Sequence, residues 1–422
     1  MSKKVILSEN ALKVAESRYF MDGEDWEKCA LRVASTISEA ESKKAEYKDK
    51  FFEMIYNMDF LPGGRILRNA GRPRGTLFNC FHLPIGDSIE EIGQFYKDAL
   101  TLWSDGGGVG CNFSPLRPTG DAIMGKGGVS SGLVSFIKAA DDIAATIESG
   151  GSRRAAALAA VDVSHPEIIN FIDAKTVHKK MSHFNISVNV NEDFLCAVET
   201  NAEWELKFKH KSYGKVKARC IWDKIINNMV KWGEPGILNW DNLSKNNSYY
   251  YDPVRGTNPC GEAVLAPYDV CDLGSLVLPN FITGNINTNW QKLEKTIKMA
   301  VRFLDNIIDV NKYTINEISI KAHNSRRIGI GVMGLAEYLF AKELRYGSEK
   351  ALSEIEKLMR FIRDSVYQES IELAVEKGAF PKFDPVSYPK ASFVKKLPVS
   401  MRMDIKTHGI RNVTSMAFAP TG

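Results

Sequence analysis

The stretch Val109-Gly-Cys-Asn-Phe113 decides the fold class, because its apolar residues alternate with small or polar ones. This period of two is expected of a β-strand, and it recurs in Phe184-Asn-Ile-Ser-Val-Asn-Val190. Between the two segments, apolar residues keep helical spacing from Val134 to Ile147, and Gly150-Gly151 is a candidate C-cap for that helix. A strand, a helix and a second strand in this order predict an α/β core.

The segment before this core reads as a separate helical domain. Apolar residues from Trp26 to Ile37 fall on one helix face, and Cys29 borders that face as a core residue. Phe60-Leu-Pro-Gly-Gly64 ends the helical pattern, so we place the domain boundary after residue 60. The predicted domains are therefore 1–60, which is helical, and 61–422, which is α/β.

Two later segments carry recognisable patterns. Thr288-Asn-Trp-Gln291 has the form of a capping box and opens a helix whose apolar stripe runs from Trp290 to Ile308. The basic segment 207–219 is interpreted as a solvated loop or hairpin rather than a binding patch.

Composition narrows the class of protein. The chain has 422 residues, 44% of them hydrophobic and 25% charged, which excludes a disordered or fibrous protein. A formal net charge of +4 is too small to indicate a nucleic-acid or membrane-surface binder. We find neither a secretory signal nor a window of 18 apolar residues, so we expect a cytoplasmic protein without a membrane segment.

Cysteine usage fits a reducing compartment. Seven cysteines, an odd number without any Cys-x-x-Cys spacing, favour reduced thiols over a disulfide framework and predict no zinc site. The glycine-rich segments 105–110 and 120–127 do not complete a dinucleotide-binding fingerprint or a P-loop, since Gly127 stands where a hydroxyl residue is needed.

The strongest local constellation is Asn258-Pro-Cys-Gly-Glu262. Pro259 disfavours helix at Asn258, and Gly261 disfavours helix after it, so the segment is predicted to be extended. An amide, a thiol and a carboxylate would then project to one face. A turn that carries a buried cysteine is an equally good interpretation of the spacing alone.

The chain resembles the large catalytic subunit of ribonucleotide reductase, most closely the adenosylcobalamin-dependent class II enzymes. Their finger loop reads Asn-Pro-Cys-Gly-Glu, as residues 258–262 do here. Ordered matches run along nearly the whole chain, in Leu7–Leu12, Gly106–Gly110, Gly150–Arg154, His165–Ile168, Gly233–Gly236, Arg326–Gly329 and Ala419–Gly422. The resemblance implies an incomplete ten-stranded α/β barrel with a central finger loop after the helical domain.

The resemblance also implies roles for the site residues. Cys260 would carry a transient thiyl radical that takes the 3′ hydrogen of a ribonucleotide, with Glu262 as general base on the 3′-hydroxyl. Asn258 and the adjoining Gly261 would bind the substrate, Asn258 through its 2′-hydroxyl. Cys80 and Cys271 would form the reducing pair that becomes a disulfide in each turnover.

Nucleotide binding is implied at two further places. Asp87 matches an acidic residue that contacts the ribose of a deoxynucleotide or ATP effector, Arg117 matches a phosphate ligand, and Arg153 lies in the loop that relays effector identity. Pro420, Thr421 and Gly422 match a loop that holds substrate phosphates. Residues 63–66, Gly-Gly-Arg-Ile, differ from the sequence that the family has in its other phosphate-contacting segment.

Several partners are expected from the resemblance: a ribonucleoside di- or triphosphate, adenosylcobalamin, a thioredoxin- or glutaredoxin-like reductant and a second copy in a homodimer. Because the chain stops within the phosphate loop, we also expect a missing C-terminal fragment from a split or intein-interrupted gene, or a truncated record. Direct binding to nucleic acid is not expected.

Three other interpretations stay open. One is a class I large subunit that receives its radical from a separate metal-bearing subunit. A second is a catalytically silent nucleotide-binding fragment. The third is a cysteine hydrolase, which would need a histidine base near Cys260, and no histidine lies close to it in the sequence.

Overall fold

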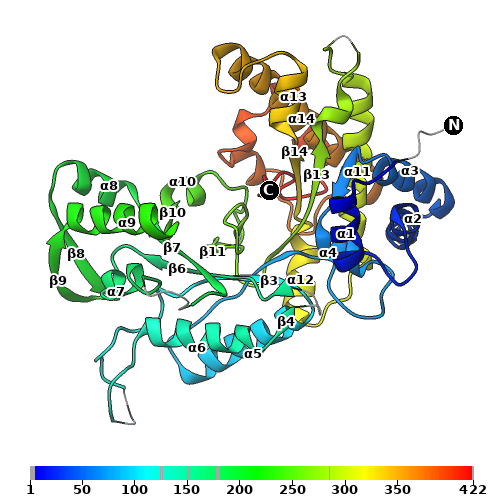
Figure 1. The fold of residues 1–422 in the computed structure, drawn as a ribbon. Coiled ribbons are helices and arrows are strands. Elements are labelled where there is room, and N and C mark those ends of the chain that lie inside the picture. Colours follow the sequence, from blue (N-terminus) through cyan, green and yellow to red (C-terminus); the bar gives the residue numbers. More distant parts are fainter. Residues whose placement is uncertain are drawn as a thin grey trace. The chain divides into compact units, whose positions relative to one another are not determined.

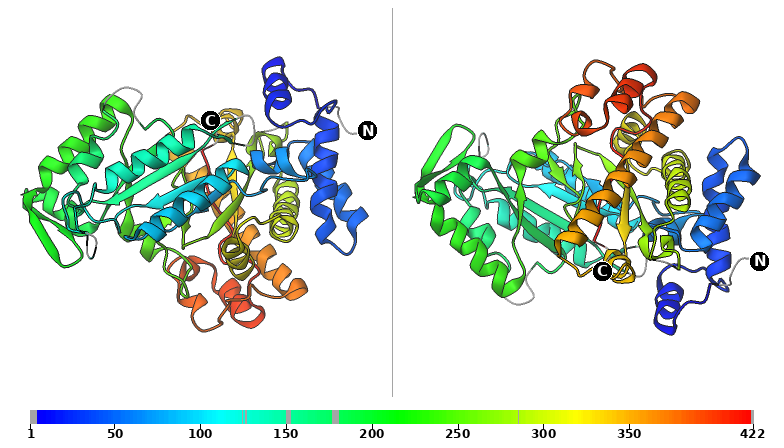
Figure 2. Two further views of the ribbon diagram at one scale, coloured as in Figure 1. Left: turned by 90° about the horizontal axis from the view of Figure 1, so that it is seen from below. Right: turned by 90° about the horizontal axis from the view of Figure 1, so that it is seen from above.

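The computed structural model describes residues 5–123, 125, 127–149, 153–176, 181–284 and 286–420. The chain forms two compact units (Figures 1 and 2). Unit 1 comprises Met1–Asn79, Ser248–Tyr251 and Val270–Gly422, and unit 2 comprises Cys80–Asn247 and Asp252–Asp269.

Unit 2 is built on a parallel sheet with the strand order β2, β3, β6, β7 and β10. The bounds are β2 Cys80–His82, β3 Gly108–Asn112, β6 Ala157–Asp162, β7 Phe184–Val190 and β10 Gly236–Asn239. Both strands predicted from period-two alternation are confirmed, since they coincide with β3 and β7. Parallel strands need crossover connections, and here helices supply them.

The helices of unit 2 follow these strands along the chain. They are α5 Ile89–Ser104, α6 Leu133–Ala145, α7 Ile168–Ile172, α8 Glu192–Glu199, α9 Ala218–Trp232 and α10 Trp240–Lys245. Figure 1 shows α5 and α6 on one face of the sheet. The core below them is aromatic, with Phe113 packed edge-on against Phe95 at 5.4 Å between ring centroids. Such pairs add about 0.5–1.5 kcal/mol beyond the area that they bury.

The predicted C-cap of α6 is wrong. The helix ends at Ala145, and Thr146 is its C-cap. The chain leaves the helix there because Glu148–Ser149 forms strand β4, which pairs with β5 Arg153–Arg154. Gly150 and Gly151 lie outside the described residues.

Two antiparallel hairpins project from the parallel sheet of unit 2. Strands β8 Glu203–Phe208 and β9 Lys211–Lys217 form the first, which confirms the hairpin predicted for the basic segment. Strands β11 Gly256–Thr257 and β12 Val264–Leu265 form the second. This second hairpin, called the finger hairpin below, carries the Asn-Pro-Cys-Gly-Glu sequence.

Unit 1 contains the N-terminal helices and a second group of strands. Strand β13 Val270–Val277 pairs antiparallel with β1 Phe60–Pro62 and parallel with β14 Ile328–Met333. The first helices are α1 Glu9–Arg18, α2 Trp26–Ile37, η1 Ser38–Ala40, α3 Lys44–Tyr56 and α4 Gly64–Asn69. The later ones are η2 Leu278–Phe281, α11 Trp290–Val310, α12 Asn316–Ser325, α13 Leu335–Ala341, α14 Glu349–Lys377, η3 Tyr388–Lys390, η4 Val394–Lys396 and α15 Val399–His408.

The sequence patterns in unit 1 are matched closely. Helix α2 spans the predicted stripe, and Cys29 is fully buried, so its assignment to the core is confirmed. Helix α11 begins where the capping box was predicted, but its N-cap is Asn289 rather than Thr288. The Asn289 side chain accepts the N–H of Lys292. The Thr288 hydroxyl instead lies 2.6 Å from the hydroxyl of Tyr338.

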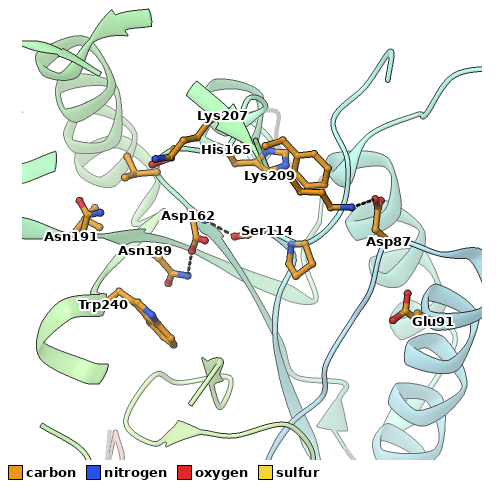
Figure 3. A pocket seen from close by; sticks show the side chains of 15 residues that line it. Asp87, Glu91, Ser114, Asp162, His165, Asn189, Asn191, Lys207, Lys209 and Trp240 are labelled. Carbon is orange, nitrogen blue, oxygen red and sulfur yellow. Dashed lines mark hydrogen bonds and ion pairs between the residues drawn. The ribbon is translucent and has the colours of Figure 1, made fainter. Parts of the chain in front are cut away.

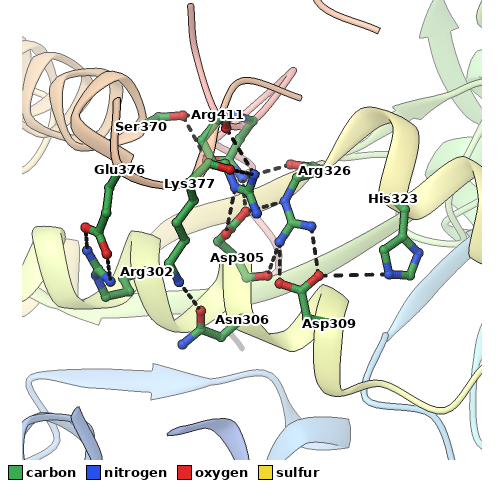
Figure 4. Close-up of polar contacts among 12 residues, drawn as sticks. Arg302, Asp305, Asn306, Asp309, His323, Arg326, Ser370, Glu376, Lys377 and Arg411 are labelled. Carbon is green, nitrogen blue, oxygen red and sulfur yellow. Dashed lines mark hydrogen bonds and ion pairs between the residues drawn. The ribbon is translucent and has the colours of Figure 1, made fainter. Parts of the chain in front are cut away.

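A buried charge network fastens α11 within unit 1 (Figure 4). Asp305 is fully buried and accepts hydrogen bonds from Arg326 at 2.8 Å and Arg411 at 3.1 Å. One turn away, Arg302 pairs with Glu41 at 3.0 Å. Since each charge in this network has a partner, the cost of desolvation is offset by hydrogen bonds and ion pairs.

Across the described ranges, none of the helices has the length and apolarity needed to cross a membrane. Within the same ranges, no group of three or more His, Cys, Asp or Glu side chains is arranged to hold a metal ion.

Candidate functional site: the finger hairpin

The tip of the finger hairpin is a tight turn rather than an extended segment. The N–H of Gly261 donates to the carbonyl of Asn258 at 3.1 Å, and Gly261 has a φ of +83°, in the left-handed region. The prediction that residues 258–262 run extended is therefore wrong. Pro259 only biases Asn258 away from helix, which a turn satisfies as well as a strand does.

The turn gives the three predicted site residues different exposures. Asn258 is fully buried, Cys260 is exposed and Glu262 is half-buried. The amide of Asn258 is held by its own turn, because its Oδ1 accepts the N–H of Ala263 at 3.0 Å. This bond leaves the Nδ2 of Asn258 available to a neighbouring side chain.

Two glycines let the hairpin lie directly on the parallel sheet. A Cβ at Gly110 in β3 would stand 1.9 Å from the carbonyl oxygen of Thr257. A Cβ at Gly256 would stand 2.3 Å from the ring of His82 in β2. Both positions require glycine for close backbone approach. The sequence analysis places Gly110 only in a Gly-rich stretch and does not single out Gly256, because the sequence does not reveal which residue approaches each glycine.

The hairpin brings Asn258 and Glu262 to Cys80, at the start of β2. Asn258 Nδ2 donates to Cys80 Sγ at 3.1 Å, and Cys80 Sγ lies 3.9 Å from Glu262 Oε1. The other carboxylate oxygen, Glu262 Oε2, is buried and has no hydrogen-bond partner among the described residues. The site thus holds a buried thiol against an amide and a carboxylate, with one acceptor atom unused.

Both thiols of this cluster are held in the protonated form. Burial raises the pKa of the Cys80 thiol well above its usual range, and the charge of Glu262 raises it further. Partial desolvation also raises the pKa of Cys260, again with a contribution from Glu262. The cluster therefore offers S–H groups and not thiolates at neutral pH.

His82 completes the wall behind the hairpin. Its Nδ1 lies 2.9 Å from the carbonyl of Gly110, and burial lowers the pKa of its ring to about 4. The imidazole is therefore neutral and packs as part of the wall.

Cys271 belongs to unit 1, in strand β13, and is buried with 1% of its surface exposed. Its sulfur contacts the neighbouring strand, because a Cβ at Gly329 of β14 would lie 2.9 Å from Cys271 Sγ. The pairing of Cys80 with Cys271 remains a prediction.

The predicted effector residues Asp87 and Arg117 lie together in unit 2. Arg117 Nε donates to Asp87 Oδ1 at 3.0 Å, and the Arg117 backbone N–H donates to the same oxygen at 2.9 Å. Although burial alone raises the pKa of Asp87, the hydrogen bonds from Arg117 and Lys209 hold it below its usual value. Lys209 comes from the β8–β9 hairpin and lies 3.2 Å from Asp87 Oδ2.

Sequence reasoning missed this contribution of the β8–β9 hairpin. Lys211 pairs with Asp121 at 2.8 Å, close to the Arg117 loop. Lys211 and Asp121 are far apart in the sequence, so the sequence alone does not reveal this contact. The sequence analysis interprets the hairpin only as a solvated element.

The remaining predicted residues are at the edge of the described chain. Pro420 is exposed at the end of unit 1, and Thr421 and Gly422 lie outside the described residues. Arg153 lies in β5, but its side chain is outside the described part.

Comparison with known proteins identifies the family of this chain. Residues 78–422 match the family model for the ribonucleotide reductase barrel domain, and residues 6–75 match the all-alpha domain of the same enzymes. This chain belongs to the ribonucleotide reductase family. The predicted fold class, a helical segment followed by an α/β barrel domain, is confirmed. The domain boundary after residue 60 remains a prediction.

Curated ribonucleotide reductases match most of the chain. It is 37% identical over 380 residues to a vitamin B12-dependent ribonucleoside-diphosphate reductase of Thermoplasma acidophilum, covering 89% of this chain and 48% of the relative. The protein of that name in Mycobacterium tuberculosis is 38% identical over 393 residues, covering 91% and 55%. A ribonucleoside-diphosphate reductase subunit alpha of Synechocystis is 29% identical, covering 93% and 57%. The chain spans about half the length of these relatives.

Proposed function

We propose that this chain supplies the thiyl-radical site of an adenosylcobalamin-dependent ribonucleotide reductase that makes deoxyribonucleotides. The observation that carries the proposal is the cluster on the finger hairpin. It presents an exposed thiol, Cys260, while Asn258 and Glu262 meet the buried thiol of Cys80 at 3.1 Å and 3.9 Å. Since the relatives from Thermoplasma acidophilum and Mycobacterium tuberculosis are named for ribonucleoside diphosphates, we propose a diphosphate substrate.

The exposure of Cys260 fits a cobalamin cofactor. A radical has to reach this sulfur from outside the hairpin, and Cys260 is exposed whereas Asn258 and Cys80 are buried. Adenosylcobalamin, when bound, supplies the organic radical that removes the hydrogen atom from a thiol. The turn around Cys260 is where the cofactor would be received.

The first half of the proposed reaction uses Cys260 and Glu262. The thiyl sulfur of Cys260 takes the hydrogen atom from C3′ of the ribose. Glu262 accepts the proton of the 3′-hydroxyl, for which Oε2, buried and without a partner among the described residues, is a ready acceptor. A raised pKa at Cys260 serves this step, because a hydrogen atom can be exchanged only with an S–H group.

The second half uses the reducing pair. Cys80 donates its proton to the departing 2′-hydroxyl, which leaves as water, and Asn258 orients that hydroxyl. The raised pKa of Cys80 keeps the proton available until this step. Cys271 then supplies the second proton, and the two sulfurs together supply two electrons, so that C2′ gains a hydrogen. Cys260 returns its hydrogen atom to C3′, and Glu262 returns its proton to the 3′ oxygen. A disulfide forms between the two sulfurs, Cys260 recovers its radical, and a dithiol reductant of the thioredoxin class would restore the pair.

We also propose the partners that the chain needs for turnover. One partner is a second copy of this chain in a homodimer. A deoxynucleotide or ATP effector would bind at Asp87 and Arg117.

The test is conversion of a ribonucleoside diphosphate to its 2′-deoxy product by the assembled enzyme, with adenosylcobalamin and a dithiol. The Cys260→Ser and Glu262→Gln variants should each lose at least a hundredfold in kcat. Cys196→Ser, an exposed thiol on α8, is the matched control and should keep full activity. Product formation that survives Cys260→Ser would refute the mechanism. A requirement for a separate metal-bearing subunit would indicate class I chemistry, and nucleotide binding without product would indicate a silent fragment.

A further inference from the structure

Unit 2 contains a second place built to receive a ligand, away from the finger hairpin. It is a cavity of about 640 Å³ at the carboxyl ends of strands β3, β6 and β7 (Figure 3). The carboxyl edge of a parallel sheet is where such folds commonly bind ligands, and the volume suits a molecule of nucleotide size. The residues that matter for recognition are Asp162, Asn189, Lys207, Lys209 and Trp240.

Asn189 is the most informative residue in this cavity. Its side chain is only 3% exposed, and its Nδ2 donates to Asp162 Oδ1 at 2.8 Å. This bond fixes the amide, because the flipped orientation would set Oδ1 against a carboxylate oxygen. The Oδ1 that remains is buried without a hydrogen-bond partner among the described residues. An acceptor left in this state costs about 1–3 kcal/mol unless a ligand or water donates to it.

The two acceptors at this end of the cavity call for a ligand with two donors on one atom. Asn189 and Asp162 both line this end of the cavity, and the bond between them leaves Asn189 Oδ1 and the carboxylate as neighbouring acceptors. An exocyclic amino group has two N–H bonds and serves both oxygens. The ring N–H of uracil or thymine has one, and the carbonyls beside it would be repelled by Asp162.

The rest of the lining suits the other parts of a nucleotide. Trp240, the first residue of α10, offers an indole on the same side of the cavity as Asn189 (Figure 3). Lys207 and Lys209 come from β8 and the turn after it, and both side chains are exposed at the rim, where Lys209 also contacts Asp87 at 3.2 Å. An aromatic platform and ammonium groups are the recurring partners of bases and phosphates.

We propose that this cavity binds a nucleotide whose base carries an amino group, with the base stacked on Trp240 and its amino group bridging Asn189 and Asp162. The phosphates lie toward Lys207 and Lys209. This inference goes beyond the proposed reductase chemistry and does not depend on it. The cavity adjoins the Asp87–Arg117 effector site, because Asp87 and Lys209 line it, but Arg117 does not line it.

The experiment measures equilibrium binding of ATP, CTP and UTP by calorimetry. It uses the chain with an Arg117→Gln substitution, which removes the phosphate ligand of the effector site. ATP and CTP should bind at least tenfold more tightly than UTP. Asn189→Leu and Trp240→Leu should each weaken ATP binding at least tenfold, while Trp240→Phe should retain most of it.

Matched controls separate recognition from misfolding. Asn185→Leu changes an exposed amide on the same strand, and Trp232→Leu changes a partly exposed indole on α9, and neither residue lines the cavity. Both variants should bind ATP as the parent chain does. The inference is overturned if the Arg117→Gln chain binds no ATP, or if it binds ATP and UTP equally. ATP binding that is insensitive to both Asn189→Leu and Trp240→Leu also overturns it. Failure of reductase activity would leave these results unchanged.

Discussion

Gly110→Ala is the substitution that most directly probes how the finger hairpin is seated. The added Cβ would stand 1.9 Å from the carbonyl oxygen of Thr257, and 3.0 Å from the carbonyl carbon of Asn258. Both neighbours are backbone atoms, so no side chain can rotate away. To restore even a 3.0 Å contact, the hairpin or β3 has to move by about 1 Å.

The expected consequences differ in size. Overpacking of this kind costs about 1–3 kcal/mol in the free energy of unfolding. A displacement of about 1 Å at a catalytic group costs on the order of a hundredfold in rate. It would also stretch the bond of 3.1 Å between Asn258 and Cys80, and expose a thiol that is only 6% exposed.

The assay combines thermal unfolding with alkylation of individual cysteines followed by mass spectrometry. Cys80 should react at least tenfold faster with iodoacetamide in the Gly110→Ala variant, whereas the exposed Cys196 should react at an unchanged rate. Gly93→Ala is the matched control, because a Cβ at that exposed position of α5 meets no atom of the described residues within 4 Å. It should stabilise the helix by up to about 1 kcal/mol. Unchanged stability and unchanged Cys80 protection in Gly110→Ala would refute the close docking of the hairpin.

Three further predictions concern charge. Glu41→Gln removes a buried carboxylate that Arg302 contacts at 3.0 Å and Lys377 at 2.8 Å, while Glu376 stays with Arg302, so it should cost about 1–3 kcal/mol in urea unfolding. Glu46→Gln, in an exposed pair, should leave the free energy of unfolding nearly unchanged. A folded-state pKa of about 4 at His82 lies below the usual 6.5, so the unfolded chain binds more protons. Stability should therefore fall by about 3 kcal/mol from pH 7 to pH 4, a loss that His82→Gln would remove. Asp87→Asn should weaken binding of a deoxynucleotide effector at least tenfold by calorimetry, and an unchanged affinity would exclude Asp87 from that site.

Local patterns in the sequence were sufficient to predict individual helices and strands. The period-two stretch 184–190 became β7 with the same bounds, and the stripe from Trp26 to Ile37 became α2. These patterns succeed because each element buries one face, and that face can be read from the sequence alone. Element ends were less secure: α6 stops at Ala145, since pairing of the following residues with β5 outweighs the helical stripe.

The candidate site was predictable in composition but not in geometry. Asn258, Cys260 and Glu262 were identified, yet the turn at Gly261 and the exposure of each side chain came only from the structure. Contacts across long sequence separations were invisible, because nothing in the sequence near Gly110 specifies Thr257 as its neighbour. The orphaned Oδ1 of Asn189 is of the same kind, since a hydrogen-bond vacancy depends on every neighbour in the fold.

The protonation of the two thiols bears on which chemistry the hairpin serves. A cysteine hydrolase needs a thiolate, which requires a nearby cation or a histidine base to lower the thiol pKa. His82 lies against the hairpin, a contact that its distance from Cys260 in the sequence does not reveal. Burial lowers the pKa of its ring to about 4, so the ring is neutral at neutral pH, and it packs against Gly256. Burial and the Glu262 carboxylate raise the pKa of Cys80, and the pKa of Cys260 is raised as well. Such an environment weakens a nucleophile and preserves an S–H bond, so it favours hydrogen-atom and proton transfer over attack on a carbonyl.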